Sequence, residues 1–413
     1  MKHVRIICRI LLGLVFIFSG FVKGIDPMGS AIKFSEYFEV FHLSWLESAA
    51  LILSVVLSTA EFLIGVALVI GLRMRVTAWA ALLFMTFFTA LTLYSAIKNP
   101  VTDCGCFGDA VKLTNWQTFY KNVILIVVAI FIFVSRNKYK PYAHAFWEWL
   151  IVAGFAALSA GISLYCINHL PIMDFRPYSV GTHIPTKMAI PKGAPADVYE
   201  TKLFYKKNGI VKEFTMNNYP WQDTTWKWEK TENVLVKKGY EPPIYGFSIT
   251  TPSGQDITPQ VLADTSYSFL FISPDITKVK YAVWSKVQDY ARFTKQQNHK
   301  FYFLTSTPAD IANKIKADKK LMIDFYATDQ TTLKTIIRSN PGLVLLKDGV
   351  VLGMWHYNDF PEPNYFKGNI LSTVLTDYHK TIEWKRIFVF LLGFVIVILA
   401  LILGRGCKKF TKR

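Results

Sequence analysis

Long apolar stretches, each followed by a short polar turn, dominate the first two-fifths of the chain, and one more lies near its C-terminal end. As helices, all of them are long enough to cross a membrane core about 30 Å thick. Between the last two stretches the sequence is mixed and largely polar. The pattern therefore predicts a polytopic α-helical membrane protein that carries a soluble domain. The predicted spans are residues 4–22, 51–72, 77–97, 116–134, 146–167 and 387–404.

Two stretches near the N-terminus need their own interpretation. Lys23-Gly24-Ile25-Asp26-Pro27 follows the first span where a signal peptide would have small residues for cleavage, so we expect an uncleaved membrane helix. Residues 32–45 mix aromatic and acidic side chains, which is typical of a helix lying in the membrane interface.

Basic residues cluster at Arg73/Arg75, at residues 136–140 and at both chain ends. By the positive-inside rule these segments are cytoplasmic, and the loop at 103–109 and residues 168–383 lie outside. We expect a multi-pass protein of the bacterial inner membrane with a periplasmic soluble domain. The formal charge of +17 is then explained by orientation signals and by attraction to anionic lipids, so we expect the lipid bilayer as a partner and no nucleic acid.

The soluble stretch divides into two parts. Residues 168–238 begin with recurring prolines and glycines, and from 199 to 236 polar and aromatic residues alternate, which predicts short antiparallel strands. Residues 239–383 predict an α/β domain. Its expected elements are a strand at 268–272, a helix at 281–296, a strand at 301–304, a helix at 309–319, and a hairpin of 343–346 and 350–355 about Asp348-Gly349.

The candidate chemistry lies in the loop Asp103-Cys104-Gly105-Cys106-Phe107-Gly108-Asp109. A disulfide between cysteines one residue apart closes a small, distorted ring that is easily reduced, and Gly105 relieves the backbone by taking positive φ. The aspartates at both ends disfavour a thiolate, while the next helix, with a capping box at Thr114 and Gln117, offers a positive end nearby. A static disulfide, or two packed thiols, remains the alternative. A metal site would need two more ligands, and none is expected.

Three further residues, Cys166, Glu61 and Lys121, are candidates for a functional role beside the two-thiol loop. Cys166, at the outer end of the fifth span, suits a third thiol in a relay or a buried small apolar residue. Glu61 lies inside the second span, where an ionisable group is costly and is typical of a proton or cofactor site. Lys121, early in the fourth span, suits the same site or a side chain that snorkels to the interface.

Residues 1–135 resemble the DoxX-like membrane proteins, most closely their methylamine-utilisation MauE branch. The resemblance is carried by Arg9 to Gly13, by Phe18-Ser19-Gly20-Phe21-Val22-Lys23, by Glu61 with Gly65 and Gly71, and by Asp103 to Gly108. It implies a four-helix bundle, in the broad style of quinone-linked disulfide-forming enzymes, that works with a separate thioredoxin-like partner. The other two spans, 146–167 and 387–404, are additions to that bundle.

Residues from about 240 to 360 resemble a thioredoxin-like domain of the TlpA and peroxiredoxin type. Gly239 to Pro243 matches the usual start of that domain, and Asn340-Pro341 stands where the family has its cis-proline. The two active cysteines of the family are missing, because Ser273-Pro274-Asp275-Ile276-Thr277 follows the first strand. The resemblance implies a redox-inactive module that docks an extended peptide at Pro341.

Three functions fit these residues. The first is a membrane thiol–disulfide oxidoreductase, in which Cys104 and Cys106 exchange with a periplasmic client and pass electrons to a quinone. The second is a non-enzymatic assembly or scaffold subunit, suggested by the cysteine-free soluble domain. The third is a transporter prompted by Glu61, against which stand the few spans and the lack of an inverted repeat.

Overall fold

The structure is a computed structural model that describes residues 2–101, 104–237 and 239–410. The chain divides into two compact units, residues 1–182 together with 248–413, and residues 183–247. The larger unit contains the membrane helices and an α/β domain, and the smaller one contains a separate antiparallel sheet.

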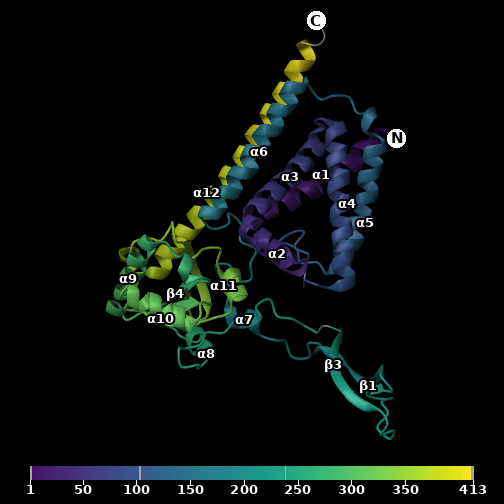
Figure 1. Ribbon diagram of the computed structural model, residues 1–413. Coiled ribbons are helices and arrows are strands. Elements are labelled where there is room, and N and C mark those ends of the chain that lie inside the picture. Colours follow the sequence, from purple (N-terminus) through teal and green to yellow (C-terminus); the bar gives the residue numbers. More distant parts are fainter. Residues whose placement is uncertain (1, 102–103, 238, 411–413) are drawn as a thin grey trace. The chain divides into compact units, whose positions relative to one another are not determined.

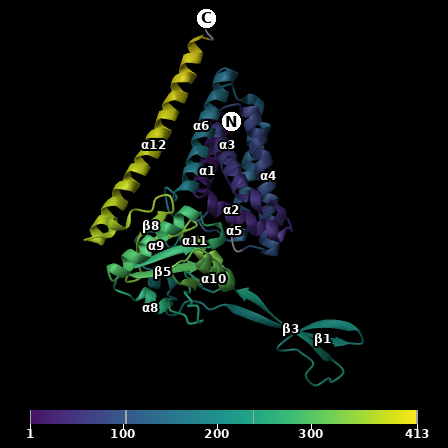
Figure 2. The same ribbon diagram turned by 60° about the vertical axis from the view of Figure 1, so that its left-hand side comes forward.

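Within the described residues, five helices are long and apolar enough to cross a membrane. The chain is therefore a multi-pass membrane protein, and each helix falls on one of the first five predicted spans. They are α1 (Lys2–Ile25), α3 (Ala50–Ile70), α4 (Met74–Lys98), α5 (Asn115–Val134) and α6 (Ala145–Asn168). Figures 1 and 2 show α1 lying beside α3, and α4 beside α5.

The predicted sixth span falls within α12 (Ile370–Phe410). The side chains of that helix are not described from residue 395 onward, so the sixth span stays a prediction.

The predicted interfacial helix corresponds to α2 (Pro27–Val40), followed by η1 (Ser44–Ala49). Asp26 caps α2, because its Oδ1 accepts a hydrogen bond of 2.9 Å from the backbone N–H of Gly29, and Pro27 suits the first helical position. The helix ends at Val40, earlier than the sequence pattern indicated, because His42 adopts a positive φ of 55°.

The closest helix pair of the bundle is α1 with α3, and glycines make that approach possible. A Cβ added at Gly20 would lie 2.5 Å from the backbone nitrogen of Phe62, and one at Gly65 would lie 2.5 Å from that of Ile17. Small residues drive helix association in membranes because they let backbones meet. This packing brings the C-terminal end of α1 against the middle of α3.

The α/β domain is built on a five-stranded sheet in the order β6-β5-β4-β7-β8. β4 (Ser268–Ser273), β5 (Lys300–Thr305) and β6 (Phe325–Ala327) are parallel, while β7 (Gly342–Lys347) and β8 (Val350–His356) form an antiparallel hairpin next to β4. Every residue of β4 is buried, as expected for a central strand covered on both faces.

Helices pack on that sheet through an aromatic core. α9 (Tyr281–Gln296) lies between β4 and β5 in sequence and contributes Trp284 and Tyr290, which contact Phe271 and Phe303. The strands, the two helices and the hairpin predicted from the sequence are confirmed, including the turn at Asp348 and Gly349, where both residues have positive φ. In the described part of the soluble stretch the pattern missed β6 and five short helices. They are α7 (Ile184–Met188) of the smaller unit, and α8 (Thr258–Leu262), η3 (Ile276–Lys278), α11 (Gln330–Ile336) and η4 (Pro363–Phe366) of the larger one. The predicted helix at 309–319 corresponds to α10 (Ala309–Asp318).

The smaller unit contains the alternating segment. β1 (Val198–Lys207) pairs antiparallel with β2 (Ile210–Thr215) and with β3 (Lys227–Lys237), in the order β2-β1-β3. The predicted short antiparallel strands are therefore confirmed.

The α1–α3 packing gives a first prediction. Gly20→Ala should destabilise the bundle by about 1–3 kcal/mol, because the added methyl group must push α3 away. The matched control is Gly161→Ala in α6, where among the described atoms none lies within 4 Å of the added Cβ, and where alanine gains up to about 1 kcal/mol in helix propensity. Thermal unfolding of both variants in detergent measures the difference, and equal midpoints would contradict the packing argument.

Candidate active site

The two-thiol loop joins α4 to α5 and is held by neighbouring polar groups. Ser19 Oγ on α1 donates a hydrogen bond of 2.7 Å to the carbonyl oxygen of Cys106. Asn115, at the start of α5, donates from Nδ2 to Asn99 Oδ1 at 2.8 Å and to the carbonyl of Val101 at 2.9 Å. The loop is thus fixed to three membrane helices. Asp103, which the sequence placed at its start, lies outside the described residues.

The two sulfurs lie next to each other. Cys104 Sγ and Cys106 Sγ are free thiols 3.4 Å apart, within hydrogen-bonding distance, and both residues are partly buried. Gly105 between them has φ +64°, as its position between two cysteines predicted. The backbone therefore holds the sulfurs where a small rotation brings them into bonding distance.

The pKa values of the two thiols are shifted in opposite directions. The hydrogen bond from Cys104 lowers the pKa of Cys106 to about 6, against the effect of burial, with Lys121 and Lys23 adding positive charge. The same hydrogen bond, with burial, raises the pKa of Cys104. The shared proton therefore stays on Cys104, and Cys106 is the thiolate and the better nucleophile and leaving group.

Lys121 is placed at this loop by an aromatic contact. Its Nζ lies 4.2 Å from the ring centroid of Phe107, and Phe107 packs against Phe18 of α1 with 5.5 Å between ring centroids. The fourth helix begins with the capping box at Thr114 and Gln117 that the sequence predicted.

Glu61 has a partner that the sequence did not assign. Its Oε2 lies 2.7 Å from Nζ of Lys23, and the two side chains are 8% and 14% exposed. Lys23 comes from the C-terminal end of α1, and Glu61 from the middle of α3. The pair satisfies both charges within the bundle and directs a positive group toward the sulfurs.

A cavity of about 560 Å³ adjoins the ion pair and the thiols. Its walls come largely from α2, α3 and α4, with Lys23 of α1 and the two-thiol loop at one part, and their surface is mainly apolar. Tyr37 is one of them, and its hydroxyl hydrogen-bonds Cys104 and lies 3.2 Å from Ser95 Oγ. The lining includes Lys23, Phe34, Tyr37, Phe38, Glu61, Phe84, Phe88, Leu91, Cys104 and Cys106.

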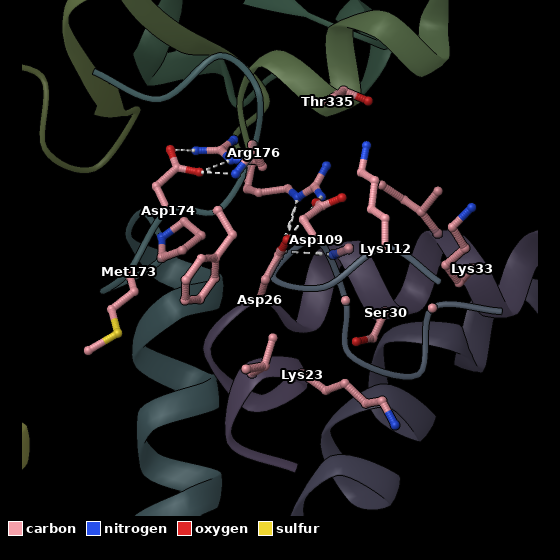
Figure 3. Close-up of a pocket in the computed structure, with 18 of the residues that line it drawn as sticks. Lys23, Asp26, Ser30, Lys33, Asp109, Lys112, Met173, Asp174, Arg176 and Thr335 are labelled. Carbon is pink, nitrogen blue, oxygen red and sulfur yellow. Dashed lines mark hydrogen bonds and ion pairs between the residues drawn. The ribbon is translucent and has the colours of Figure 1, made fainter. Parts of the chain in front are cut away.

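A second pocket, of about 190 Å³, is lined by Gly105, Gly108 and Asp109 of the loop and by several charged side chains (Figure 3). Arg338 spans Asp26 and Asp109, with Nη2 2.9 Å from Asp26 Oδ2 and 3.2 Å from Asp109 Oδ2. Figure 3 shows Arg176 hydrogen-bonded to Asp174 in the same pocket, while the Lys23 side chain extends away from Asp26.

The pKa values of Asp26 and Asp109 are shifted in opposite directions in that pocket. Burial alone would raise the pKa of Asp26, but Arg338, with Arg176 and the Gly29 N–H, outweighs it, and the net effect lowers that pKa. For Asp109 burial dominates and raises the pKa, with Arg338 as a partial offset. Asp109 is thus engaged by Arg338, and the charges that act most strongly on Cys106 are those of Lys121, Lys23 and Glu61.

The remaining predicted residues lie elsewhere. Cys166 is 1% exposed and packs with Ile25 and Ile172, as a small apolar residue does. Pro341 follows a cis peptide bond and is buried. Beside it, Asn340 Oδ1 accepts from Ser273 Oγ at 2.5 Å, and Asn340 Nδ2 donates to the Asp275 carbonyl at 2.8 Å. Ser273, the last residue of β4, therefore places its hydroxyl beside the Asn340–Pro341 bond.

The sequence interpretation missed Lys23, Tyr37 and the Asp26–Arg338 pair as site residues. Lys23 was visible within the motif that ends the first span, but an amine at a span end is ordinarily read as an interface anchor. Asp26 and Arg338 are 312 positions apart, so only the fold brings them together.

The fold and the site define a multi-pass membrane protein with an α/β domain after its fifth helix and a dithiol loop in its bundle. The family model of Methylamine utilisation protein MauE matches residues 1–135, so that part of the chain is a MauE-family membrane domain. A model of a domain of unknown function, DUF8463, matches residues 199–238, which cover the three-stranded sheet.

The chain is also similar to Protein TlpB of Flavobacterium psychrophilum, with 28% identity over 133 residues. That similarity spans 32% of this chain and 36% of the relative, so it covers about a third of each. No solved structure matches the chain.

The charge arrangement gives a second prediction. In a Cys104→Ser background, whose hydroxyl keeps the donor, alkylation of Cys106 by iodoacetamide should rise with pH about a midpoint near 6 and slow below it as the thiolate gains a proton. Lys121→Met should move the midpoint upward by about half a unit or more. Lys138→Met, beyond the other end of α5, is the control and should leave it in place. A midpoint near 8.5 in the background variant would contradict the assignment.

Proposed function

We propose that the chain is a membrane-embedded thiol–disulfide oxidoreductase or maturation factor that acts on periplasmic proteins through Cys104 and Cys106. The observation that carries the proposal is the pair of sulfurs 3.4 Å apart, one of them stabilised as a thiolate. The match of residues 1–135 to the MauE model supports it.

The exchange has a defined balance. A client dithiol attacks the Cys104–Cys106 disulfide, one bond to the client forms as the internal bond breaks, and the second client thiol completes the client disulfide. Cys104 and Cys106 are left as the dithiol, which has taken up two electrons and two protons. Cys106 is the favoured leaving group because its thiolate is stabilised by Lys121 and Lys23.

The α/β domain is proposed to be a thioredoxin-like docking module. Its support is the connection β4–α9–β5 with parallel strands, followed by the antiparallel β7–β8 hairpin beside β4, the arrangement expected of that fold. The segment at Ser273 has no cysteine, so the domain binds clients without exchanging electrons. The loop at Asn340-Pro341 is its proposed client-binding segment, and a separate thioredoxin-like protein is proposed as a further partner.

The proposed location is the bacterial inner membrane, with both termini cytoplasmic and the soluble domains periplasmic. The basic turns at 73–75 and 136–140 support this orientation. Under the oxidising conditions outside that membrane a disulfide at Cys104–Cys106 would persist.

Orientation is tested by a matched pair of cysteine substitutions. Asn208→Cys lies in the exposed turn between β1 and β2, and Asn137→Cys lies in the exposed turn after α5. In cells with a permeabilised outer barrier, a membrane-impermeant maleimide should label the first and leave the second unlabelled until the inner membrane is opened. The reverse labelling pattern would place the soluble domains in the cytoplasm. The two thiols would then not face the oxidising compartment that the proposal requires.

The exchange reaction is tested by single serine variants. In either Cys104→Ser or Cys106→Ser the remaining loop thiol should attack the disulfide form of a client, the exchange run in reverse, and accumulate a mixed disulfide, because the second loop thiol that would release the client is gone. The double variant should capture nothing, and Cys166→Ser should behave as wild type. Non-reducing electrophoresis detects the mixed disulfides, and mass spectrometry identifies the captured proteins. If neither single variant captures a client protein and the thiol states of periplasmic proteins are unchanged, the proposal is contradicted.

A second candidate is a non-enzymatic assembly subunit. It is favoured by one observation, the closed hydrogen-bond network of Ser273, Asn340 and Asp275 where a thioredoxin-like enzyme would keep its thiols. Under this alternative the double serine variant retains full function, while deletion of residues 168–383 abolishes it. The oxidoreductase proposal expects the double variant to be inactive.

A further inference from the structure

Arg338 connects two segments to which the proposed function gives different tasks. It lies between α11 and the Asn340-Pro341 bond, two residues before Asn340. Its side chain is 5% exposed and reaches two carboxylates. Nη2 lies 2.9 Å from Asp26 Oδ2 and 3.2 Å from Asp109 Oδ2, and Nε donates to Asp26 at 3.0 Å. Asp109 follows Cys106 by three residues, so one guanidinium links the Asn340-Pro341 segment to the two-thiol loop.

The connection is short and constrained on the side of the α/β domain. Arg338 Nη1 donates to the carbonyl of Lys334 in α11. Ser339 Oγ donates to the Pro341 carbonyl and accepts a hydrogen bond of 3.1 Å from the N–H of Tyr357. Three residues of chain span at most about 11 Å, so the backbone of Pro341 is held within that distance of Arg338.

The two-thiol loop is constrained in the same way. The N–H of Gly108 donates to the carbonyl of Gly105 at 3.1 Å, which closes a turn around the second cysteine. Asp109 comes directly after that turn and lies at most about 11 Å of backbone from Cys106. A guanidinium bound to Asp109 therefore keeps the cysteines a short distance from the α/β domain.

A second buried arginine supports the same connection. Arg176, in the segment after α6, donates from Nη1 to the carbonyl of Ile336, the last residue of α11, at 3.1 Å. Asp174 holds the Arg176 side chain through two hydrogen bonds of 2.7 and 2.6 Å. Arg176 and Arg338 thus both contact the C-terminal end of α11, from which the Asn340-Pro341 segment leaves.

Neither stability nor thiol tuning accounts for this network. Buried ion pairs are often no better for stability than apolar residues of the same volume. The charges that act most strongly on the Cys106 thiol come from α1, α3 and α5, and Arg338 is not among them. What an arginine that binds a carboxylate through two nitrogens adds is geometric, because paired hydrogen bonds fix direction as well as distance.

We propose that Arg338 is a positioning residue for thiol–disulfide exchange. It holds the Asn340-Pro341 segment at the two-thiol loop, so that a client bound to that segment meets the Cys104–Cys106 disulfide of the same chain. The inference rests on the proposed function and adds the residue that brings client and disulfide together. A tethered reactant acts at a high effective concentration only if the geometry of the tether allows it. A small dithiol reaches the disulfide without docking and has no need of Arg338.

The test compares two reductants of the full-length protein in nanodiscs, with the Cys104–Cys106 disulfide formed beforehand. Reduced, unfolded ribonuclease A is the protein probe, because it offers cysteines in extended segments, and dithiothreitol is the small probe. Alkylation with mass spectrometry measures the rate at which the disulfide is lost in one turnover. Arg338→Met should slow the reaction with ribonuclease A at least tenfold and leave the dithiothreitol rate within twofold of wild type.

Matched variants separate the ion pair from other effects. Asp26→Asn removes a charge but keeps the cap of α2, since asparagine caps as well as aspartate. It should slow the ribonuclease reaction, and adding it to Arg338→Met should cost little more, because both changes break one contact. Arg338→Lys keeps the charge and should recover part of the rate. Arg292→Met removes a 72% exposed arginine paired with Asp289 and should stay within twofold of wild type.

Amide hydrogen exchange tests the connection without a client. Arg338→Met should increase exchange at residues 104–110 and at residues 336–340 together, while Arg292→Met should increase it at neither. If Arg338→Met does not fold, Arg338→Lys and Asp26→Asn carry both measurements, with smaller expected effects.

Three results would overturn the inference: an unchanged ribonuclease rate in Arg338→Met, equal slowing of both reductants, which would mean damage to the loop itself, or unchanged amide exchange at both segments. Failure of the proposed function gives a different result. Wild type would then react with dithiothreitol and not with ribonuclease A, and amide exchange would still decide whether Arg338 joins the two segments.

Discussion

Lys23 and Glu61 meet at 2.7 Å in a part of the bundle where both side chains are largely withdrawn from solvent. Either charge alone would be expensive there, since the cost of taking an ion out of water is several kcal/mol even after relaxation. The pair offsets that cost only if α1 and α3 hold both groups in register. Replacing it by apolar residues of similar volume would be neutral or stabilising in many proteins, so stability alone does not account for it.

The glycines of α1 and α3 are what make the register possible. Gly20 lies one turn before Lys23 and touches the backbone of Phe62, the residue after Glu61. Any side chain at that position must push α1 and α3 apart and lengthen the ion pair. The ammonium is thereby fixed beside the loop that Ser19, one residue before Gly20, anchors through the carbonyl of Cys106. One segment of seven residues, 17–23, therefore makes the close contact with α3, anchors the two-thiol loop and carries the Lys23 ammonium.

Much of this arrangement was accessible from the sequence. Apolar stretches gave the first five spans, strict periodicity gave α9 with its bounds, and Asp348-Gly349 gave the β7–β8 hairpin. Cys104, Cys106 and Glu61 were identifiable because each is chemically unusual in its surroundings. Lys121 was ambiguous, since a cation near a span end suits solvent as well as a site, and only the contact with Phe107 places it.

What the sequence left out depends on contacts between distant segments. The three-residue strand β6 carries too few positions to show a period, and it exists because β5 offers it a parallel edge. Arg338 is an unremarkable surface residue in the sequence until the fold brings Asp26 and Asp109 within 3.2 Å of it. The cavity likewise belongs to no single segment, because α2, α3 and α4 each supply only part of its wall.

The distribution of sulfur along the chain has a mechanistic consequence. No cysteine lies between Cys166 and Cys407, so the α/β domain has no dithiol that could be oxidised or reduced. The Ser273 hydroxyl donates a hydrogen bond of 2.5 Å to Asn340. Under the proposed function, client binding and electron transfer are then carried out by different parts of one chain. The binding surface is free to vary without altering the thiol pKa values, because those are set mainly by the hydrogen bond between Cys104 and Cys106, with Lys121 and Lys23 of the bundle adding positive charge. Conversely, a change in the bundle alters the rate of exchange for every client alike, which is the behaviour expected when recognition and chemistry depend on separate groups.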